Sequence, residues 1–184
     1  MRMNRDNAHL LIIDIQEKLV PAVVEHEPLI AAAVRLITIA RRLDVPVTVS
    51  EQYPRGLGAT VTPVRHALGN GAVVIDKVHF SCLREERLRH RFEALRADGR
   101  DQIVVAGMET HVCVALTVLD LLAEGFQTFV VADVVSSRGQ KNIDIALRRL
   151  EAQGAVLVSG EMVMFEWLDK AGTAEFKELQ QLIK

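Results

Sequence analysis

Six short apolar runs, spaced along the chain, restrict its fold more than any other feature. Each run is nearly continuous instead of alternating with polar residues, and this pattern is typical of strands buried on both faces of a sheet. The runs are HLLIID at 9–14, VPVTVS at 45–50, AVVID at 72–76, QIVVAG at 102–107, QTFVVAD at 127–133 and AVLVS at 155–159. We therefore expect six buried strands.

Helix-like segments separate these runs. They cover 28–43, 83–99, 113–125 and 141–154, and a final stretch, 161–184, has the pattern of one or two further helices. Regular alternation of strand and helix predicts an α/β fold, a three-layer α/β/α arrangement around a six-stranded, mostly parallel, doubly wound and Rossmann-like sheet. A chain of 184 residues can bury a substantial core, so residues 1–184 are expected to form a single domain.

Charge and cysteine content argue against several classes of protein. Lys plus Arg number 22 and Asp plus Glu number 24, and the net charge of -2 gives no electrostatic reason to expect a nucleic acid or an anionic membrane as partner. The first apolar run ends at Asp14, too early for a signal-peptide core or a membrane span. Two cysteines, Cys82 and Cys113, do not suggest a small secreted scaffold held by disulfides. We expect a cytoplasmic protein.

Two other classes share this fold class and are disfavoured by their motifs. A nucleotide binder would carry G-x-G-x-x-G or G-x-x-x-x-G-K-[ST] at a strand-to-helix junction, and neither motif occurs there. A phospho-receiver domain would carry an aspartate after the third strand, where this chain has Lys77. We therefore expect no cofactor.

Three reactive side chains lie at the ends of predicted strands. Asp14 closes the first strand, Lys77 follows the third, and Cys113 follows the fourth at the start of a helix. Ligands of such sheets bind beyond the carboxyl ends of the strands, so the three side chains should converge. The first helical turn would lower the pKa of the Cys113 thiol, because it lies at the positive end of the helix dipole. In the same turn, Thr110 is interpreted as a helix cap and His111 as a rim residue instead of a catalytic base.

Each of these residues also has a simpler interpretation. Asp14 could cap a loop, Lys77 could be a solvated lysine while Asp76 points inward, and Cys113 could be a small apolar core residue. Cys82 also precedes a helix, and we interpret it as mainly structural. Only the convergence of Asp14, Lys77 and Cys113 favours chemistry over these alternatives.

Three motifs, in this order and spacing, resemble a known family. LLIIDIQEKLV, DKVHFSC and VVAGMETHVCV look like the cysteine-hydrolase family that includes isochorismatase, nicotinamidase and N-carbamoylsarcosine amidohydrolase. SEQYPRGLGATV, VADVVSSR and EMVMFEWL look closest to its isochorismatase-domain-containing branch, whose substrates are poorly assigned. The resemblance covers nearly the whole chain and implies the isochorismatase-like version of the α/β fold.

The resemblance implies an Asp-Lys-Cys triad of Asp14, Lys77 and Cys113. In that family the cysteine attacks a small amide-type carbonyl and forms a thioester, the aspartate takes and returns the proton, and the lysine holds the charges in place. By analogy, the backbone N–H groups of Glu109 and Cys113 form the oxyanion hole, and a cis peptide bond joins Met108 to Glu109. The expected enzyme is a hydrolase of C–N bonds. A vinyl ether hydrolase of the isochorismatase type, or a non-catalytic interaction protein that has kept the fold, remains an alternative.

The chain departs from the nicotinamidase pattern after the second strand. Nicotinamidases carry a metal-binding Asp-x-His there, whereas this chain has Ser50 and Gln52, and the lone His66 cannot make a site. We therefore expect no metal.

A loop at 50–62 follows the second strand at the same edge and is expected to cover or line the pocket, with Arg55 available for an anionic substrate. Asp133 is expected to brace the loop beyond the fifth strand. The residues assigned to binding of the small-molecule substrate are Gln16, Gln52, Tyr53 and Phe80.

The last segment carries more apolar side chains than one small domain is expected to cover. This pattern predicts a homo-oligomer, a dimer or larger. The apolar residues are Met162, Met164, Phe165, Trp167, Phe176, Leu179 and Leu182.

Overall fold

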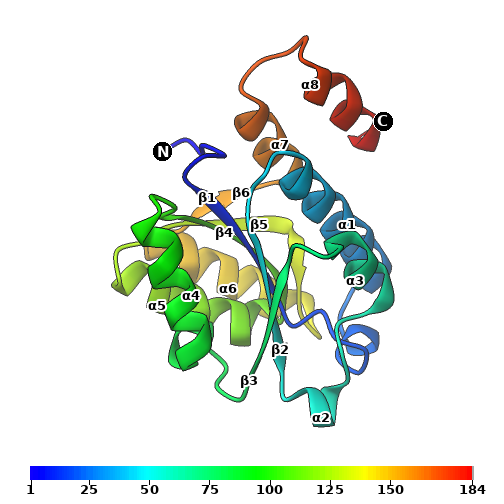
Figure 1. The fold of residues 1–184 in the computed structure, drawn as a ribbon. Helices are drawn as coiled ribbons and strands as arrows, with labels where there is room; N and C mark the ends of the chain where they lie inside the picture. The colour runs from blue at the N-terminus through cyan, green and yellow to red at the C-terminus, as the bar shows by residue number, and fades with distance from the viewer. Residues whose placement is uncertain (184) are drawn as a thin grey trace.

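A single six-stranded sheet organises the chain in the computed structural model, which describes residues 1–183 (Figure 1). The strands pair in the order β3-β2-β1-β4-β5-β6, and all five pairings are parallel. The strands are β1 (Ala8–Ile13), β2 (Val47–Gln52), β3 (Val73–Lys77), β4 (Gln102–Met108), β5 (Gln127–Ser136) and β6 (Val156–Val158). This order confirms the predicted doubly wound fold.

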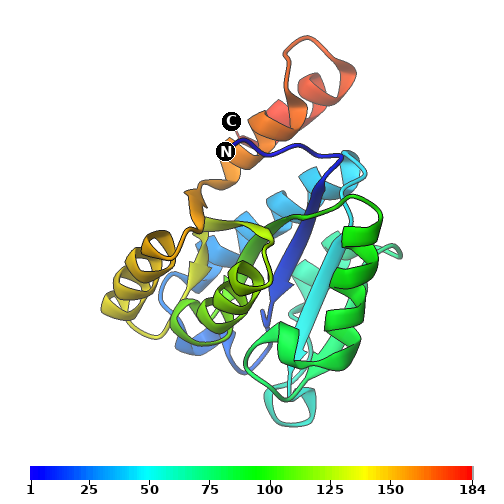
Figure 2. The same ribbon diagram turned by 90° about the vertical axis from the view of Figure 1, so that its left-hand side faces the viewer.

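Helices cover both faces of the sheet, which gives the three predicted layers (Figures 1 and 2). One face carries α1 (His26–Arg42), α3 (Thr62–Leu68) and α7 (Gly160–Leu168), and the other carries α4 (Glu86–Ala97), α5 (Ala115–Ala123) and α6 (Gln140–Ala152). Shorter elements complete the chain: α2 (Pro54–Leu57), α8 (Ala174–Leu179), the 3-10 turns Val20–Ala22, Cys82–Arg84 and Gln180–Ile183, and a π-helical turn, Thr110–Val114.

The central strand β1 is buried along its whole length because it divides two hydrophobic cores. Leu10 and Ile12 belong to the core beneath α1, whereas Leu11 and Ile13 belong to the core beneath α4 and α5. Alternate residues of one strand therefore supply both cores, as expected for a strand without polar alternation.

Strand β2 differs from this pattern. Val47 and Val49 enter the core beneath α1, but Thr48, Ser50 and Gln52 are polar and also buried. Side chains alternate across a strand, so these three share the opposite face. The sequence analysis interpreted 45–50 as an apolar run and did not predict this polar row.

The structure subdivides two predicted helices and adds two that were missed. The segment 83–99 is a 3-10 turn followed by α4, and 113–125 is the end of the π-helical turn followed by α5. The short helices α2 and α3 lie between β2 and β3, where no helix was predicted. Only Val64 and Leu68 of α3 are buried, which leaves too few apolar positions for a clear helical period.

The segment after β2 is held firmly to the residues that follow β1. The backbone N–H groups of Glu17 and Lys18 donate to the carbonyls of Ala59 and Leu57, both at 3.0 Å. Gln16 pairs with Thr60 in an isolated antiparallel bridge. The predicted loop at 50–62 is thus a short helix and a turn with fixed hydrogen bonds.

The C-terminal helices α7 and α8 extend away from the sheet as an arm (Figure 2). The Asp133 carboxylate accepts a hydrogen bond from Gly160 N–H at 2.8 Å, at the start of α7. Asp133 therefore braces the start of this arm, and its predicted role beyond β5 is wrong. Within residues 1–183, no helix is long and apolar enough to cross a membrane.

Candidate active site

The reactive residues meet where the order of the strands reverses. Strands β1 and β4 are neighbours although 88 residues lie between them, and such switch points are where α/β sheets bind ligands. Asp14 follows β1 with a positive φ of 52°. Gly107, near the end of β4, has φ 119°, and a Cβ there would overlap the Ile13 carbonyl oxygen. Glycine therefore lets β4 approach the residue that precedes Asp14.

Asp14 and Lys77 form a fully buried ion pair. The Lys77 ammonium donates to Asp14 Oδ2 at 2.8 Å, and neither side chain is exposed to solvent. Ser50 donates its hydroxyl to the other carboxylate oxygen, Oδ1, at 2.7 Å. Both oxygens of Asp14 therefore have a donor, which is how buried carboxylates remain charged.

Three more acceptors hold the Lys77 ammonium. They are Gln52 Oε1 at 2.6 Å, the Phe80 carbonyl at 3.2 Å and the His79 carbonyl at 3.3 Å. Burial opposes the charge of Lys77, but the negative charge of Asp14 and the hydrogen bond to it outweigh burial and raise the lysine pKa. Lys77 is therefore a fixed positive charge, and the alternative of a solvated lysine with Asp76 inward is wrong, since Asp76 is the exposed residue.

Cys113 lies beside this ion pair, with 6 % of its surface exposed. Burial and the negative charge of Asp14 raise the pKa of Cys113, and the lowering effect of Lys77 is smaller. The predicted low pKa is therefore wrong. The resting thiol is neutral, and a carboxylate stands ready to accept its proton.

The turn before Cys113 is π-helical, from Thr110 to Val114, and α5 begins only at Ala115. A cis peptide bond joins Met108 to Glu109, as the family resemblance implied. The Thr110 hydroxyl is buried and finds no hydrogen-bond partner among residues 1–183, so its predicted capping role is wrong.

Two contacts tie this turn to the loop after β5. The Glu109 carboxylate accepts hydrogen bonds from the Arg138 guanidinium at 2.9 Å and from Arg138 N–H at 3.2 Å. His111 Nδ1 lies 3.0 Å from the Ser137 hydroxyl. The turn that carries Cys113 is thus anchored from both of its polar side chains, and the oxyanion role of Glu109 and Cys113 N–H stays a prediction.

Cys82 is closer to the chemistry than its interpretation as structural implied. It is fully buried, and its N–H donates to the Thr117 hydroxyl at 3.0 Å. Burial and the negative charge of Asp14 raise the pKa of Cys82 to about 11, so this thiol is also neutral.

The four residues assigned to substrate binding fall into two groups. Gln16 and Gln52 are buried, and their amide groups are occupied: Gln16 bonds to the backbone of Gln52 and of Gly58, and Gln52 bonds to Lys77 and Val78. They support the site from within instead of facing a substrate.

Tyr53 and Phe80 form the second group. Their side chains are more than half exposed, and their backbones adjoin Lys77, because Tyr53 N–H donates to the Lys77 carbonyl at 2.8 Å and the Phe80 carbonyl accepts from the ammonium. Both are therefore placed at the rim, where binding of a substrate stays a prediction.

Ser50 is the residue that the sequence analysis missed. It was considered only as a replacement for a metal ligand, yet it touches Asp14 directly. One sequence signal could have found Ser50: polar residues alternate at 48, 50 and 52, within a strand that is expected to be buried. Buried polar side chains on one face of a strand need hydrogen-bond partners there.

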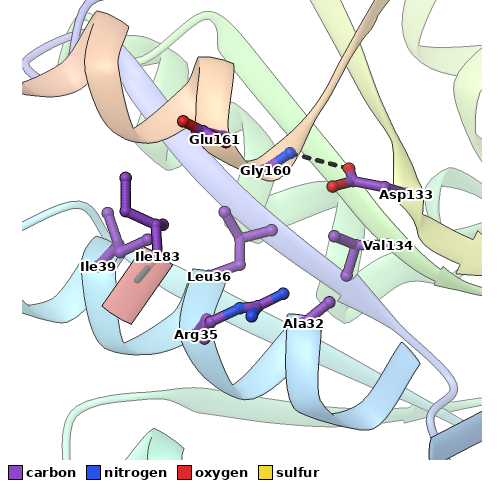
Figure 3. Close-up of a pocket in the computed structure, with 9 residues that line it drawn as sticks. All are labelled: Ala32, Arg35, Leu36, Ile39, Asp133, Val134, Gly160, Glu161 and Ile183. Atoms are coloured by element: carbon purple, nitrogen blue, oxygen red, sulfur yellow. Dashed lines mark hydrogen bonds between the residues drawn. The ribbon is translucent and has the colours of Figure 1, made fainter. Parts of the chain in front are cut away.

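A cavity of the structure lies away from the triad residues. A space of about 150 Å³ between α1, β5 and the start of α7 is lined by apolar side chains such as Leu36 and Val134, with Arg35, Asp133 and Glu161 at its polar side (Figure 3). None of the triad residues lines it. Among residues 1–183 there is no group of three or more His, Cys, Asp or Glu arranged to hold a metal, and the expected independence from metal stays a prediction.

Comparisons with known proteins identify relatives over the whole chain. The family model described as Isochorismatase domain matches residues 8–162. Isochorismatase domain-containing protein 2A of Mus musculus is 35% identical over 186 residues, which cover 100% of this chain and 85% of the mouse protein.

Solved structures share the fold as well. The MAR1 ribonuclease structure from Caenorhabditis elegans superposes with a TM-score of 0.92 and 33% identity, covering 100% of this chain and 92% of that one. The YcaC gene product of Escherichia coli, described as an octameric hydrolase of unknown specificity, has a TM-score of 0.89 and 24% identity, with 99% and 90% coverage. The second likeness concerns the fold alone.

Proposed function

Because the chain belongs to the isochorismatase domain family of cysteine-hydrolase-like proteins, we propose that it hydrolyses a small amide-type substrate, with Cys113 as the nucleophile. The observation that carries this proposal is the fully buried ion pair of Asp14 and Lys77 at the same edge of the sheet as the buried Cys113 thiol, whose pKa the charge of Asp14 raises. A nucleophile with an adjacent base and a charged orienting group is the arrangement that covalent hydrolysis requires.

The first half-reaction forms the thioester. Asp14 takes the thiol proton as the Cys113 sulfur attacks the carbonyl carbon, and the resulting oxyanion is met by the backbone N–H groups of Glu109 and Cys113. The C–N bond then breaks, and Asp14 returns the proton to the departing nitrogen. Lys77 remains charged throughout and stabilises the carboxylate form of Asp14.

The second half-reaction releases the acid. A water molecule attacks the thioester carbon while Asp14 takes one of its protons, and the C–S bond breaks as Asp14 returns that proton to the Cys113 sulfur. Asp14 has to return each proton that it accepts. An ion-paired carboxylate suits this role, because a strong base would hold the proton.

Turnover of a panel of small amides, ureas and vinyl ethers tests the proposal. RNA belongs in the panel because one structural relative is named a ribonuclease. We expect hydrolysis of a C–N bond, complete loss of turnover in Cys113→Ala, and an acyl mass on the Cys113 peptide when deacylation is slow. A matched Cys82→Ala variant should retain measurable turnover. Wild-type turnover in Cys113→Ala would contradict the proposal, and cleavage of a vinyl ether alone would favour the isochorismatase-type alternative.

The proposal also covers the cellular location, the assembly and the cofactor requirement of the enzyme. We propose a cytoplasmic location, since Cys82 and Cys113 are free thiols and a reducing compartment would preserve them. A homo-oligomer is also proposed, from the exposed Met162 and Phe165 of α7. The substrate is proposed to be a small molecule, without a metal or other cofactor.

A further inference from the structure

Ser50 is the second side chain, besides Lys77, that donates a hydrogen bond to the Asp14 carboxylate. Its position is set by the sheet, because Ile13 and Ser50 are register partners and Asp14 N–H donates to the Ser50 carbonyl at 3.1 Å. The side chain is fully buried, and its hydroxyl lies 2.7 Å from Asp14 Oδ1. A rigid neighbour of this kind can set the rotation of a carboxylate.

The proton of the Ser50 hydroxyl has one destination. An ionised carboxylate only accepts hydrogen bonds, so Ser50 must donate to Asp14.

The two carboxylate oxygens have separate donors. Ser50 donates to Oδ1, while Lys77 donates to Oδ2. The carboxylate is therefore held in one orientation through both of its oxygens.

We propose that Ser50 is a positioning residue that orients Asp14 for proton exchange with Cys113. This inference rests on the proposed function, because it assigns Ser50 a role through the general base and not in contact with the substrate.

A substrate-independent measurement gives the first test. Iodoacetamide labelling of Cys113, followed by peptide mass from about pH 6 to about pH 10, reports how much thiolate is present. Without the Ser50 donor, the negative charge of Asp14 is less compensated, so it favours the neutral thiol of Cys113 over the thiolate more strongly. Cys113 of Ser50→Ala should therefore be labelled about tenfold more slowly at neutral pH. Ser50→Thr, which keeps the hydroxyl, should restore the wild-type rate.

Turnover of the panel substrate gives the second test. In Ser50→Ala we expect kcat to fall about tenfold with little change in KM, and the acid limb of the pH profile to move to higher pH by about one unit. The matched control is Thr48→Val, which removes a buried hydroxyl from the same face of β2 but does not touch the triad. That variant should keep the wild-type labelling rate, kcat and acid limb.

Several results would overturn the inference. A folded Ser50→Ala variant with wild-type labelling, kcat and acid limb would do so, as would equal losses in Thr48→Val. If Ser50→Ala does not fold, Ser50→Cys keeps a side chain of similar shape with a weaker donor and should slow labelling of Cys113 and kcat about threefold in the same direction. An unchanged labelling rate and acid limb in that variant would also overturn it. Loss of the proposed function is recognised separately, by turnover that survives in Cys113→Ala.

Discussion

At the scale of single residues, Asp14 disfavours the thiolate form of Cys113, whereas the surroundings of an activated cysteine favour its thiolate. Asp14 raises the pKa of the thiol while Lys77 lowers it less. Burial is the largest cause of the raised pKa of Cys113 and adds to the effect of Asp14, so the thiol stays protonated until a substrate arrives. Reactivity then depends on proton transfer to Asp14 instead of a standing population of thiolate.

Asp14→Asn separates thiolate formation from catalysis. Removing the negative charge should lower the pKa of Cys113 and leave Lys77 to stabilise the thiolate, so iodoacetamide should label Cys113 faster at neutral pH, by about tenfold for each unit of pKa change. Turnover should nevertheless be lost, because the proton acceptor is gone. Labelling rates and turnover measured on one preparation check both signs, and slower labelling would contradict this account of the site.

Cys113 should also be labelled before Cys82, because Cys82 is fully buried and Cys113 is slightly exposed. Access and the adjacent base determine this order, since both thiols have raised pKa values. That Cys113 is the reactive cysteine stays a prediction from the sequence, and the sequence could not predict the sign of its pKa shift. That sign depends on burial and on the distance to Asp14, and neither is visible in the residue order.

His9 is a buried titratable residue outside the candidate active site, near the start of β1. Its Nε2 lies 2.8 Å from the Thr48 hydroxyl, and its Nδ1 has no hydrogen-bond partner among residues 1–183. Burial, then the charges of Arg91 and Arg100, lower the pKa of His9 from 6.5 to about 3. The folded protein therefore keeps His9 neutral over a range in which the unfolded chain binds a proton.

Acid should destabilise the protein through His9. Between pH 6.5 and about pH 3 the unfolded state binds more protons, so the free energy of unfolding falls as pH falls, by up to roughly 1.4 kcal/mol per pH unit. Near pH 5 the loss is about 2 kcal/mol. Urea unfolding at about pH 7.5 and about pH 5 should show this loss in the wild type and a smaller one in His9→Gln. Equal losses in both proteins would contradict the assignment.

At the scale of elements, the close approach of β1 and β4 depends on Gly107. A side chain there would overlap the Ile13 carbonyl oxygen and would also need a positive φ. Gly107→Ala should therefore lower the free energy of unfolding by about 3 kcal/mol or more. Gly71→Ala is the control, since a Cβ at Gly71 meets nothing within 4 Å. Denaturant unfolding of both variants checks the prediction, and a stable Gly107→Ala would show that the strands can separate at little cost.

Elements with a strong apolar pattern were predictable, and elements held by polar contacts were not. The strands around β1 and β4 and the long helices follow directly from their apolar residues. The helix α2 and the turn after it are instead held by backbone hydrogen bonds to residues 15–18, which no periodicity reveals. The π-helical turn before α5 is equally invisible, because its five residues, Thr110–Val114, are too few to show a period of their own.

At the scale of the whole molecule, the order of the strands explains the site. The right-handed connections place β1 and β4 side by side, so Asp14 and Cys113 come from opposite halves of the chain and Lys77 arrives from β3 across β2. The sequence predicted this convergence from strand ends alone. It could not predict the role of Ser50, because that role depends on which residue of the neighbouring strand β1 lies opposite Ser50, and the residue order does not show this pairing.

The C-terminal arm gives the last prediction. Met164, Trp167 and Leu179 are buried within the chain, so the uncovered apolar surface is smaller than the sequence suggested. Met162 and Phe165 remain exposed at 47% and 44% and line a shallow surface on α7. Each such side chain contributes roughly 2 kcal/mol when buried, and a symmetric contact buries it once on each copy.

Light scattering at micromolar concentration should therefore find a dimer or larger assembly in the wild type and a smaller species in the double variant Met162→Lys, Phe165→Glu. The control is Ile145→Lys on α6, a side chain of similar exposure on the opposite face of the sheet. We expect it to leave the assembly intact, because α6 and α7 lie on different layers (Figure 1). A monomeric wild type would contradict self-association altogether. Dissociation by the Ile145 change alone would instead move the interface to α6 and leave the arm as a solvent-exposed extension.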